Sequence, residues 1–398
     1  MTDRLSSSSI PDPTLSGKIR SVILIALAQV AALSVWFSSS AIIPDITQEF
    51  SPSPGRLAAL TSAVQLGFVA GAFASAVLSL PDRMRPQSLF ALSALSAALA
   101  NAYMLVTIPG GDASIAARFV VGAALAGVYP VGLKLAAGWG RRDRGLLVGL
   151  LVGALTLGSA FPHLLAGSGL IDWRNLIGAT SLVAALSAAL ILFTRTGPFH
   201  GSASGFDPHR AMLIWRDPVM RRINLGYLGH MWELYAMWAW IGFALIAEGG
   251  FTQNAASQTT FAVIAIGAPA CALGGYLADR LGKARFTILA MATSGVCALL
   301  SGALLHGPVW LLLPVLLIWG ASVIADSAQF SALIVDHAPQ SVSGSMLTMQ
   351  TLQGFLLTVV TVQGLAWLSA AIGWQTGLAI LALGPALGIA AMWRLRER

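Results

Sequence analysis

Three titratable side chains stand inside stretches that are otherwise almost entirely apolar. His230 and Glu233 are three positions apart in "GHMWELYAMWAW" (229–240), and Asp326 stands within "WGASVIADSAQF" (319–330). Burial among apolar groups disfavours the charged form of a carboxylic acid, so such a group can bind and release a proton near neutral pH. A histidine one turn away can share that proton. The residues therefore predict proton transfer.

The stretches that carry these residues are long enough to cross a membrane. The chain of 398 residues is 56% hydrophobic and 10% charged, with a mean hydropathy of +0.77. Soluble domains carry about 25% charged residues, and an apolar helix of about 20 residues crosses the hydrocarbon core of a bilayer. We predict an all-α membrane protein with twelve spans, at 19–43, 57–80, 88–107, 114–139, 145–167, 175–194, 221–247, 256–278, 286–305, 309–335, 343–367 and 374–393.

Positive charges gather on one side of this arrangement. Of the 23 Lys and Arg residues, 19 fall in the tails and alternate loops of one side, two (Arg56, Arg174) on the other side, and two (Arg118, Lys134) within spans. Cytoplasmic loops carry such an excess. We therefore predict a multi-pass protein of the inner or plasma membrane with both termini in the cytoplasm. The net charge of +7 then follows from topology, and we expect no nucleic-acid partner.

The spans fall into two groups of six. We expect a disordered cytoplasmic tail over 1–18, a six-helix bundle over 19–194, a cytoplasmic linker over 195–220 and a second six-helix bundle over 221–398. Transporters are commonly built from such repeats, with the substrate site near the midplane between them.

Short motifs recur in the two groups of spans. Asp82-Arg83 recurs as Asp279-Arg280, 197 residues later by subtraction, and Gly122 of the fourth span recurs as Gly320 of the tenth. The segment "GYLADRLGKAR" (275–285) resembles the loop motif Gly-x-Leu-Ala-Asp-Arg-x-Gly-Arg/Lys of the major facilitator superfamily. The copy "LSLPDRMRPQS" (78–88) keeps the Asp-Arg pair but not the glycines.

This resemblance implies two pseudo-symmetric six-helix bundles and alternating access. It also implies a gating role for Asp82, Arg83, Asp279 and Arg280 at the cytoplasmic ends of the helices; the alternative is a cationic cluster that only sets topology. The chain is similar in outline to the cyanate and nitrate permease-like branches, although spans 2 and 8 lack the interior arginine of nitrate porters.

Helical phase indicates which groups face a central cavity. Glu233 shares a face with Gly226, Gly229 and His230 near the middle of its span. Ionisable residues inside a membrane are functional candidates by default. We predict Glu233 as the principal proton-coupling carboxylate, His230 as its tuning partner and Asp326 as the second carboxylate. The alternative is a buried packing pair. Two ligands without a third argue against a metal site, and we expect none.

Other polar and aromatic side chains in the spans are candidates for binding the substrate. Arg118 could hold an anionic group, or its side chain could extend to the membrane surface. We expect Lys134 to extend to the surface, and His163 is compatible with either a cavity or a structural position. The predicted substrate-binding residues are Trp36, Gln65, Arg118, Tyr129, Trp240, Gln329 and Gln350.

The motifs favour transport over catalysis. The sequence has no phosphate-binding glycine loop, nucleophile elbow or metal-ligand cluster, and its central loop is too short for an ATPase. We expect no enzymatic activity and no cofactor. We predict a monomeric proton-coupled secondary transporter that takes up a small organic solute, by preference an anion, with protons and membrane lipid as its other partners. The alternatives are a proton-coupled exporter of amphipathic or cationic compounds, and a transporter-like receptor.

Overall fold

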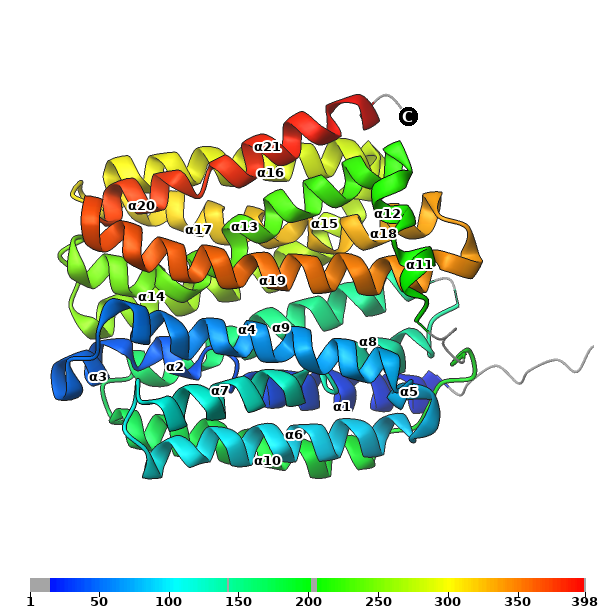
Figure 1. Cartoon of the computed structure of the whole chain (residues 1–398), viewed down its shortest axis with the longest axis horizontal. Helices are drawn as coiled ribbons and strands as arrows, with labels where there is room; N and C mark the ends of the chain where they lie inside the picture. Colours follow the sequence, from blue (N-terminus) through cyan, green and yellow to red (C-terminus); the bar gives the residue numbers. More distant parts are fainter. Residues whose placement is uncertain (1–14, 142, 202–205, 397–398) are drawn as a thin grey trace, which may run out of the picture.

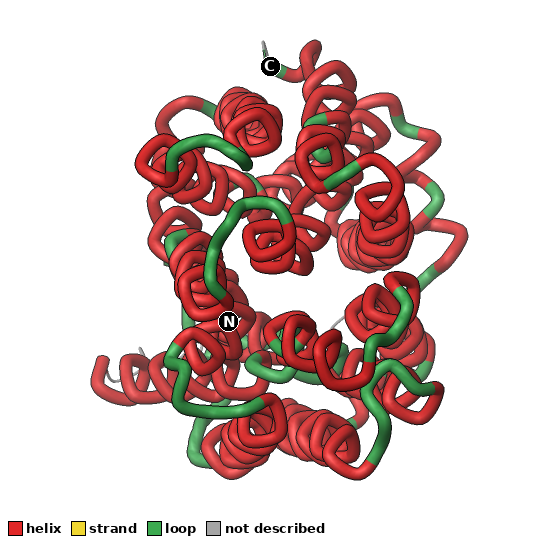
Figure 2. Tube along the Cα trace, turned by 90° about the vertical axis from the view of Figure 1, so that its left-hand side faces the viewer, coloured by secondary structure: helices red, strands yellow, loops and turns green. Residues whose placement is uncertain are grey.

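The computed structural model describes residues 15–141, 143–201 and 206–396, without the side chains of 340 and 341, and every regular element in these ranges is a helix. Figure 1 shows the helices running along the long axis of the molecule, with those of the first half of the chain below those of the second half. Seen along that axis in Figure 2, the helices are viewed nearly end on and strands are absent from the described part.

The described residues of the first half form ten α-helices and one 3-10 helix. They are α1 (Leu15–Leu33), α2 (Ser38–Ala41), α3 (Ile43–Phe50), α4 (Pro54–Val77), α5 (Leu80–Arg83), α6 (Pro86–Ala102), η1 (Tyr103–Val106), α7 (Asp112–Leu125), α8 (Tyr129–Ala137), α9 (Arg144–Gly167) and α10 (Trp173–Leu192).

The linker and the second half supply the remaining elements. They are α11 (Pro208–Ala211), α12 (Leu213–Arg216), α13 (Pro218–Ala247), α14 (Gln253–Ala265), α15 (Gly267–Leu281), α16 (Lys283–Leu304), α17 (Val309–Ala325), α18 (Ser327–His337), α19 (Gln340–Ile372), α20 (Trp374–Ile380), α21 (Leu383–Met392) and η2 (Trp393–Leu395).

Eleven segments of the described chain are long and apolar enough to cross a membrane, and each overlaps a predicted span. The predicted seventh span, α13, is not among them, although it is 30 residues long. Its composition explains the difference, because it carries Asn224, His230 and Glu233 besides its tryptophans and tyrosines. The span that holds the titratable pair His230 and Glu233 is thus the least apolar one.

The first predicted span is not one continuous helix, so that prediction is wrong. α1 begins at Leu15, four residues before the predicted start, and ends at Leu33. The rest of the predicted tail, 1–14, lies outside the described residues. Serine hydroxyls donate hydrogen bonds to backbone carbonyls at the break: Ser34 Oγ donates to the carbonyl of Ala31 (2.7 Å) and Ser38 Oγ to that of Val35 (3.0 Å). Such local bonds compete with the helical ladder.

The fourth and tenth spans are interrupted at matching positions. α7 ends at Leu125 and α8 begins at Tyr129, because Pro130 lacks the N–H that would bond to Ala126 one turn earlier. In the second half, α17 ends at Ala325 and α18 begins at Ser327, so Asp326 occupies the interruption. A titratable group therefore stands where the regular backbone is broken.

Equivalent helix contacts within each half confirm the internal repeat. A Cβ on Gly122 would lie 1.9 Å from the carbonyl oxygen of Val64, and a Cβ on Gly320 would lie 1.8 Å from that of Val263. The two glycines let α7 approach α4, and α17 approach α14, at backbone distance. The equivalence of these pairs shows that the offset of 198 residues (320 − 122) reflects structure.

Two groups of helix contacts join the halves: α4 packs against α19, and α9 packs against α14 and α15. Figure 1 shows α4 and α19 side by side at the middle of the molecule. Gly153 of α9 lies against Ala268 of α15, where an added Cβ would be 3.2 Å from the carbonyl oxygen. Small residues therefore bring the halves together along this interface.

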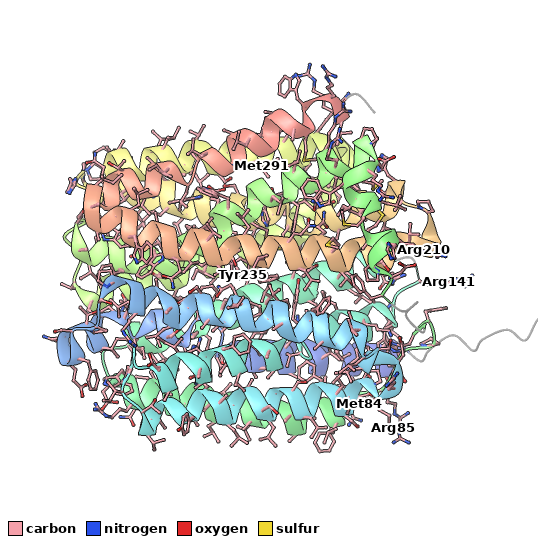
Figure 3. All side chains as sticks on the ribbon, in the orientation of Figure 1. Met84, Arg85, Arg141, Arg210, Tyr235 and Met291 are labelled. Atoms are coloured by element: carbon pink, nitrogen blue, oxygen red, sulfur yellow. The ribbon has the colours of Figure 1, made fainter. Side chains whose placement is uncertain are left out.

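The cationic loops lie at one end of the molecule. Figure 3 shows Arg85, Arg141 and Arg210 together at its right-hand end, although they come from three different loops. The predicted linker 195–220 also runs at that end; it includes α11, α12 and the first residues of α13, and its residues 202–205 lie outside the described part. We call this the cationic end, and the opposite one the outer end.

Candidate functional site

A cavity of about 710 Å³ lies between the two halves. Its wall comes from α4, α8 and α9 of the first half and from α13, α18 and α19 of the second. The wall extends to Asp82, Arg144 and Phe206, so the cavity reaches the cationic end. Cavities of 300–1,000 Å³ are typical of sites for small molecules.

Aromatic rings from both halves close the inner end of the cavity. Phe68, Tyr235 and Phe355 line it, and Trp36, which is fully buried, lies behind them. The ring centroid of Trp36 is 5.1 Å from that of Phe68, 5.9 Å from that of Tyr235 and 5.6 Å from that of Phe355. Figure 3 places Tyr235 midway along the molecule, at the boundary between the halves. We call these four residues the ring cluster.

Charged side chains stand only near the mouth among the residues that line the cavity: Asp82, Lys134 and Arg144. Lys134 Nζ lies 3.3 Å from Asp82 Oδ1. Lys134 itself lines the cavity, so the expectation that it extends to the membrane surface is wrong. Burial, and then the charge of Lys134, lower the pKa of nearby His200, so this histidine is neutral at pH 7.

Glu233 is buried inside the second half. Its side chain accepts hydrogen bonds from Ser294 Oγ of α16 (2.8 Å to Oε2) and from Trp319 Nε1 of α17 (2.7 Å to Oε1). Glu233 is not part of the cavity wall, so the predicted placement on that wall is wrong for this conformation. The sequence contained no sign of its two partners, because helical phase does not tell which neighbouring helix covers a face.

His230 and Asp326 form a second buried group. Nδ1 of His230 lies 2.9 Å from Oδ1 of Asp326, and both side chains are almost completely buried. Ile324, two residues before Asp326, and Ser327, directly after it, line the cavity, and so does Met231, the residue after His230. The pair therefore lies one layer behind the cavity wall. The three predicted proton-coupling residues come together on α13 and at the α17–α18 break, and their role stays a prediction.

Arg118 lies away from both the cavity and the surface. The side chain is completely buried, and its guanidinium donates to the carbonyl oxygens of Val35 (2.9 Å), Trp36 (2.6 Å) and Leu60 (3.2 Å). It also donates to Asn101 Oδ1 (2.7 Å). The alternative of a side chain that extends to the surface is therefore wrong, and the substrate-binding role of Arg118 stays a prediction. Carbonyls freed by the break after α1 hold the cation instead.

The other predicted substrate-binding residues take different positions. Tyr129 lines the cavity, whereas Trp240 donates from Nε1 to the carbonyl of Val362 (3.0 Å) inside the second half. Gln65, Gln329 and Gln350 are buried and do not line the cavity. His163 is buried in α9, and its Nε2 has no hydrogen-bond partner among the described residues.

The predicted gating residues all lie at the cationic end. Arg83, Asp279 and Arg280 are exposed, and the guanidinium of Arg280 lies 4.4 Å from the ring centroid of Tyr276. Next to them, Lys283 of the same motif forms an ion pair with Asp336 at the end of α18. The motif thus contacts its own half here, and its gating role stays a prediction.

At the outer end the halves are joined by contacts that the sequence did not reveal. Gln253 Nε2 of α14 donates to Asp45 Oδ1 of α3 (2.6 Å), and Gln258 Nε2 donates to the carbonyl of Gly167 at the end of α9 (2.8 Å). The halves are thus in contact at the outer end, while the cavity between them reaches the cationic end. The conformation is therefore open on one side only.

These features define a polytopic helical membrane transporter with a cavity between two repeated halves. The family model described as Major Facilitator Superfamily matches residues 25–362, and the chain belongs to this superfamily. It is therefore a transporter and not an enzyme. The match assigns no branch, and a search of curated proteins finds none that matches.

Solved structures show the same fold. A partially occluded inward open conformation of the xylose transporter XylE from E. coli superposes with a TM-score of 0.74 at 11% identity, covering 95% of this chain and 99% of the other. A proton:xylose symporter XylE bound to 6-bromo-6-deoxy-D-glucose gives 0.72 at 13% identity, with 94% and 95% covered. A D-xylose-proton symporter gives 0.74 at 13% identity, with 94% and 97% covered. At such identities the likeness shows the fold alone.

Proposed function

We propose that this protein is a proton-coupled secondary transporter of a small organic solute, and that the structure is its inward-facing state. The observation that carries the proposal is the His230–Asp326 pair directly behind the wall of a one-sided cavity. Buried ionisable groups in a membrane mark ion pathways. Protonation of such groups can bias which side of the molecule is open. The similar symporters indicate only that the fold permits proton coupling.

The orientation of the protein in the membrane follows from the distribution of its Lys and Arg residues. The cavity reaches the end that holds the loops of Arg85, Arg141 and Arg210, and the excess of Lys and Arg assigns that end to the cytoplasm. Both termini and the linker are then cytoplasmic, in the inner or plasma membrane. Impermeant maleimide should label a cysteine at Ser88 from the cytoplasmic side and one at Ser53 from the outside. Labelling of both from the same side would refute this orientation.

The preference for an anionic solute rests on Lys134 and Arg144 rather than on Arg118. Arg118 is occupied by protein acceptors, but Lys134 and Arg144 outnumber Asp82 at the cavity mouth. A cleft lined by an excess of one charge raises the local concentration of the opposite charge. We therefore retain uptake of an organic anion, as in the cyanate and other anion permease-like branches, by a monomer. The aromatic inner end supports the second candidate, export of amphipathic compounds.

The test uses purified protein in proteoliposomes loaded with a pH-sensitive dye. Small carboxylates, neutral amides and organic cations are added outside one at a time. The expected result is proton influx that depends on one solute class and is lost in Glu233→Gln. Solute uptake without any proton movement would contradict the proposed coupling.

A further inference from the structure

Gln65 is a fully buried amide that the protein leaves without a partner. Within the described residues neither its Nε2 nor its Oε1 has a hydrogen-bond partner, and the same is true of the indole Nε1 of Trp36. Buried polar groups in folded proteins are almost always hydrogen-bonded, so each exception indicates a missing water, ion or ligand. Two such exceptions close together indicate a site.

The two side chains face the same space. Ser40 Oγ lies 2.9 Å from Thr61 Oγ1, which joins α2 to α4. Trp36 lies in the break between α1 and α2, and Gln65 follows Thr61 by four residues, one turn along the same face of α4. Phe68, one turn after Gln65, confirms this placement by its 5.1 Å ring contact with Trp36.

The surroundings of this space are mostly aromatic, and the donors of the nearby cation Arg118 are taken by the protein. The rings of Phe68 and Phe355 separate it from the cavity, with their centroids 4.4 Å apart. The charged residues that line the cavity stand at the mouth, and the donors of Arg118 bind protein carbonyls. An ionised carboxylate here would receive no hydrogen bond from a charged group, because the guanidinium of Arg118, which bonds to the carbonyl of Trp36, donates to protein acceptors, and this is unfavourable in an apolar site.

A glutamine amide presents a donor and an acceptor side by side. Its natural partner is a group with an acceptor and a donor on one edge, which a carboxamide or a protonated carboxylic acid provides. The N–H of Trp36 can donate to the second lone pair of the partner's carbonyl oxygen. Flat groups also suit a space that is bounded by rings.

We propose that Gln65 and Trp36 form a subsite for the uncharged carboxamide or protonated carboxylic acid group of a flat organic solute. The proposal rests on the proposed transport function and specifies the substrate class. The subsite becomes accessible when the rings of the two halves separate, since Phe355 and Tyr235 come from the second half and Phe68 from the first.

The two ends of the cavity then act on one solute in succession. Lys134 and Arg144 at the mouth attract the anion of a weak organic acid. The inner end binds the neutral acid, which is in equilibrium with the anion in solution, so the protein supplies no proton to form it. An acid bound in this way brings its own proton into the transport cycle.

The test measures calorimetric binding of three flat probes to the full chain in nanodiscs. Benzamide is a neutral isostere of the protonated acid, benzoate ionises, and benzenesulfonate remains an anion. Benzamide should bind equally at every pH, and benzoate should lose about tenfold in affinity for each pH unit above its own pKa, because only its neutral fraction binds. Tight binding of benzenesulfonate, pH-independent binding of benzoate or no benzamide binding would each overturn the proposal.

Variants connect the binding to the two residues. Gln65→Leu should lower benzamide affinity at least about tenfold through loss of two hydrogen bonds, and Trp36→Phe about three- to tenfold. Thermal stability of ligand-free Gln65→Leu should not fall, because the Gln65 amide has no partner among the described residues. The matched control is Gln363→Leu on α19, whose amide oxygen is also unpartnered within the described chain and which should bind benzamide like the wild type. Unchanged binding by Gln65→Leu would overturn the proposal.

The subsite and the proposed function fail in different ways. If benzamide binding depends on Gln65 but no solute drives proton influx, the subsite stands and proton coupling is wrong. If a solute drives proton influx but Gln65→Leu binds and transports it normally, transport stands and the subsite is wrong.

Discussion

Nδ1 of His230 lies 2.9 Å from Oδ1 of Asp326, in a region where both side chains are 2% exposed or less. The contact joins α13 to the break between α17 and α18, one layer behind the cavity. The rings of Phe330 and Tyr227 lie against the imidazole, with centroids 5.4 and 6.1 Å away. The pair is thus held in an aromatic setting where each polar group depends on the other for a partner.

This dependence predicts a non-additive effect on stability. His230→Leu leaves the buried carboxyl of Asp326 without its partner and should cost about 1–3 kcal/mol, whereas His230→Leu/Asp326→Leu should cost less, because no unpaired polar group remains. Thermal unfolding of the single and double variants gives the coupling energy. Additive losses in the double variant would show that the two groups do not interact.

Arg118 is predicted to stabilise the fold rather than bind substrate. Arg118→Leu should cost at least about 3 kcal/mol, because it removes the hydrogen bonds of a buried cation to the carbonyls of Val35, Trp36 and Leu60. Arg118→Lys should recover only part of the lost stability, since one ammonium group cannot reach acceptors on several segments. The exposed Arg174→Leu is the control. Normal thermal stability of Arg118→Leu combined with lost anion binding would restore the substrate-binding role.

The outer contacts should set the balance between inward- and outward-facing states. The double substitution Gln253→Leu/Gln258→Leu removes the two hydrogen bonds between the halves. It should shift this balance about 5- to 100-fold toward the outward-facing state, because each bond contributes about 1 kcal/mol. The measurement is the rate at which impermeant maleimide labels a cysteine at Ser331 in the cavity wall, which should fall. The exposed Gln48→Leu at the same end serves as the control. Unchanged labelling would mean that other contacts close the outer end.

Asp279→Asn should change the rate of transport more than the half-saturating solute concentration. Asp279 is exposed at the end of α15 and lies outside the wall of the central cavity, so it can affect the conformational exchange but not the solute contacts. Solute-dependent proton influx gives both quantities. Asp112→Asn, an exposed acid on the opposite side of the membrane, is the control. A collapse of affinity at a normal maximal rate would contradict a gating role.

Most of the fold could be predicted because the bilayer dictates long apolar helices and marks their cytoplasmic ends with cations. The interruptions could not be predicted as readily. Pro130 is a visible signal for the break before α8, but the break after α1 arises from serine hydroxyls and from Arg118, which lies 83 residues away from Val35. A single sequence does not show which distant donor will hold freed carbonyls.

The residue types of the candidate site could be identified from the sequence, but the contacts that these residues make could not. An isolated carboxylate in an apolar span is conspicuous, which identifies Glu233 and Asp326. Helical phase places Glu233 toward the cavity, whereas Ser294 and Trp319 cover it in the structure. Trp319 shares a helical face with Asp326, and that position gives no sign of its bond to Glu233. Which faces meet depends on the packing of six helices, and that information is distributed over the whole chain.

Glu233 is the residue whose titration should drive the change of conformation. Glu233→Gln keeps both contacts in the neutral form, because the amide oxygen can accept from Trp319 and the amide nitrogen can donate to Ser294, whose hydroxyl also reaches the carbonyl of Met291 at 3.1 Å. The variant should therefore fold normally and behave at every pH as the protonated protein does. His230, Asp326 and Cys297 are the other titratable groups nearby, and the substitution leaves His230 and Asp326 in place.

The most direct measurement of this claim needs no knowledge of the solute. Spin labels at Gln48→Cys and His306→Cys, with Cys271 and Cys297 replaced by alanine, report the separation of the two halves at the outer end in nanodiscs. The wild-type distance distribution should shift between acidic and alkaline pH, and Glu233→Gln should show the acidic distribution throughout. A Glu233→Gln protein that shifts with pH as the wild type does would contradict the account.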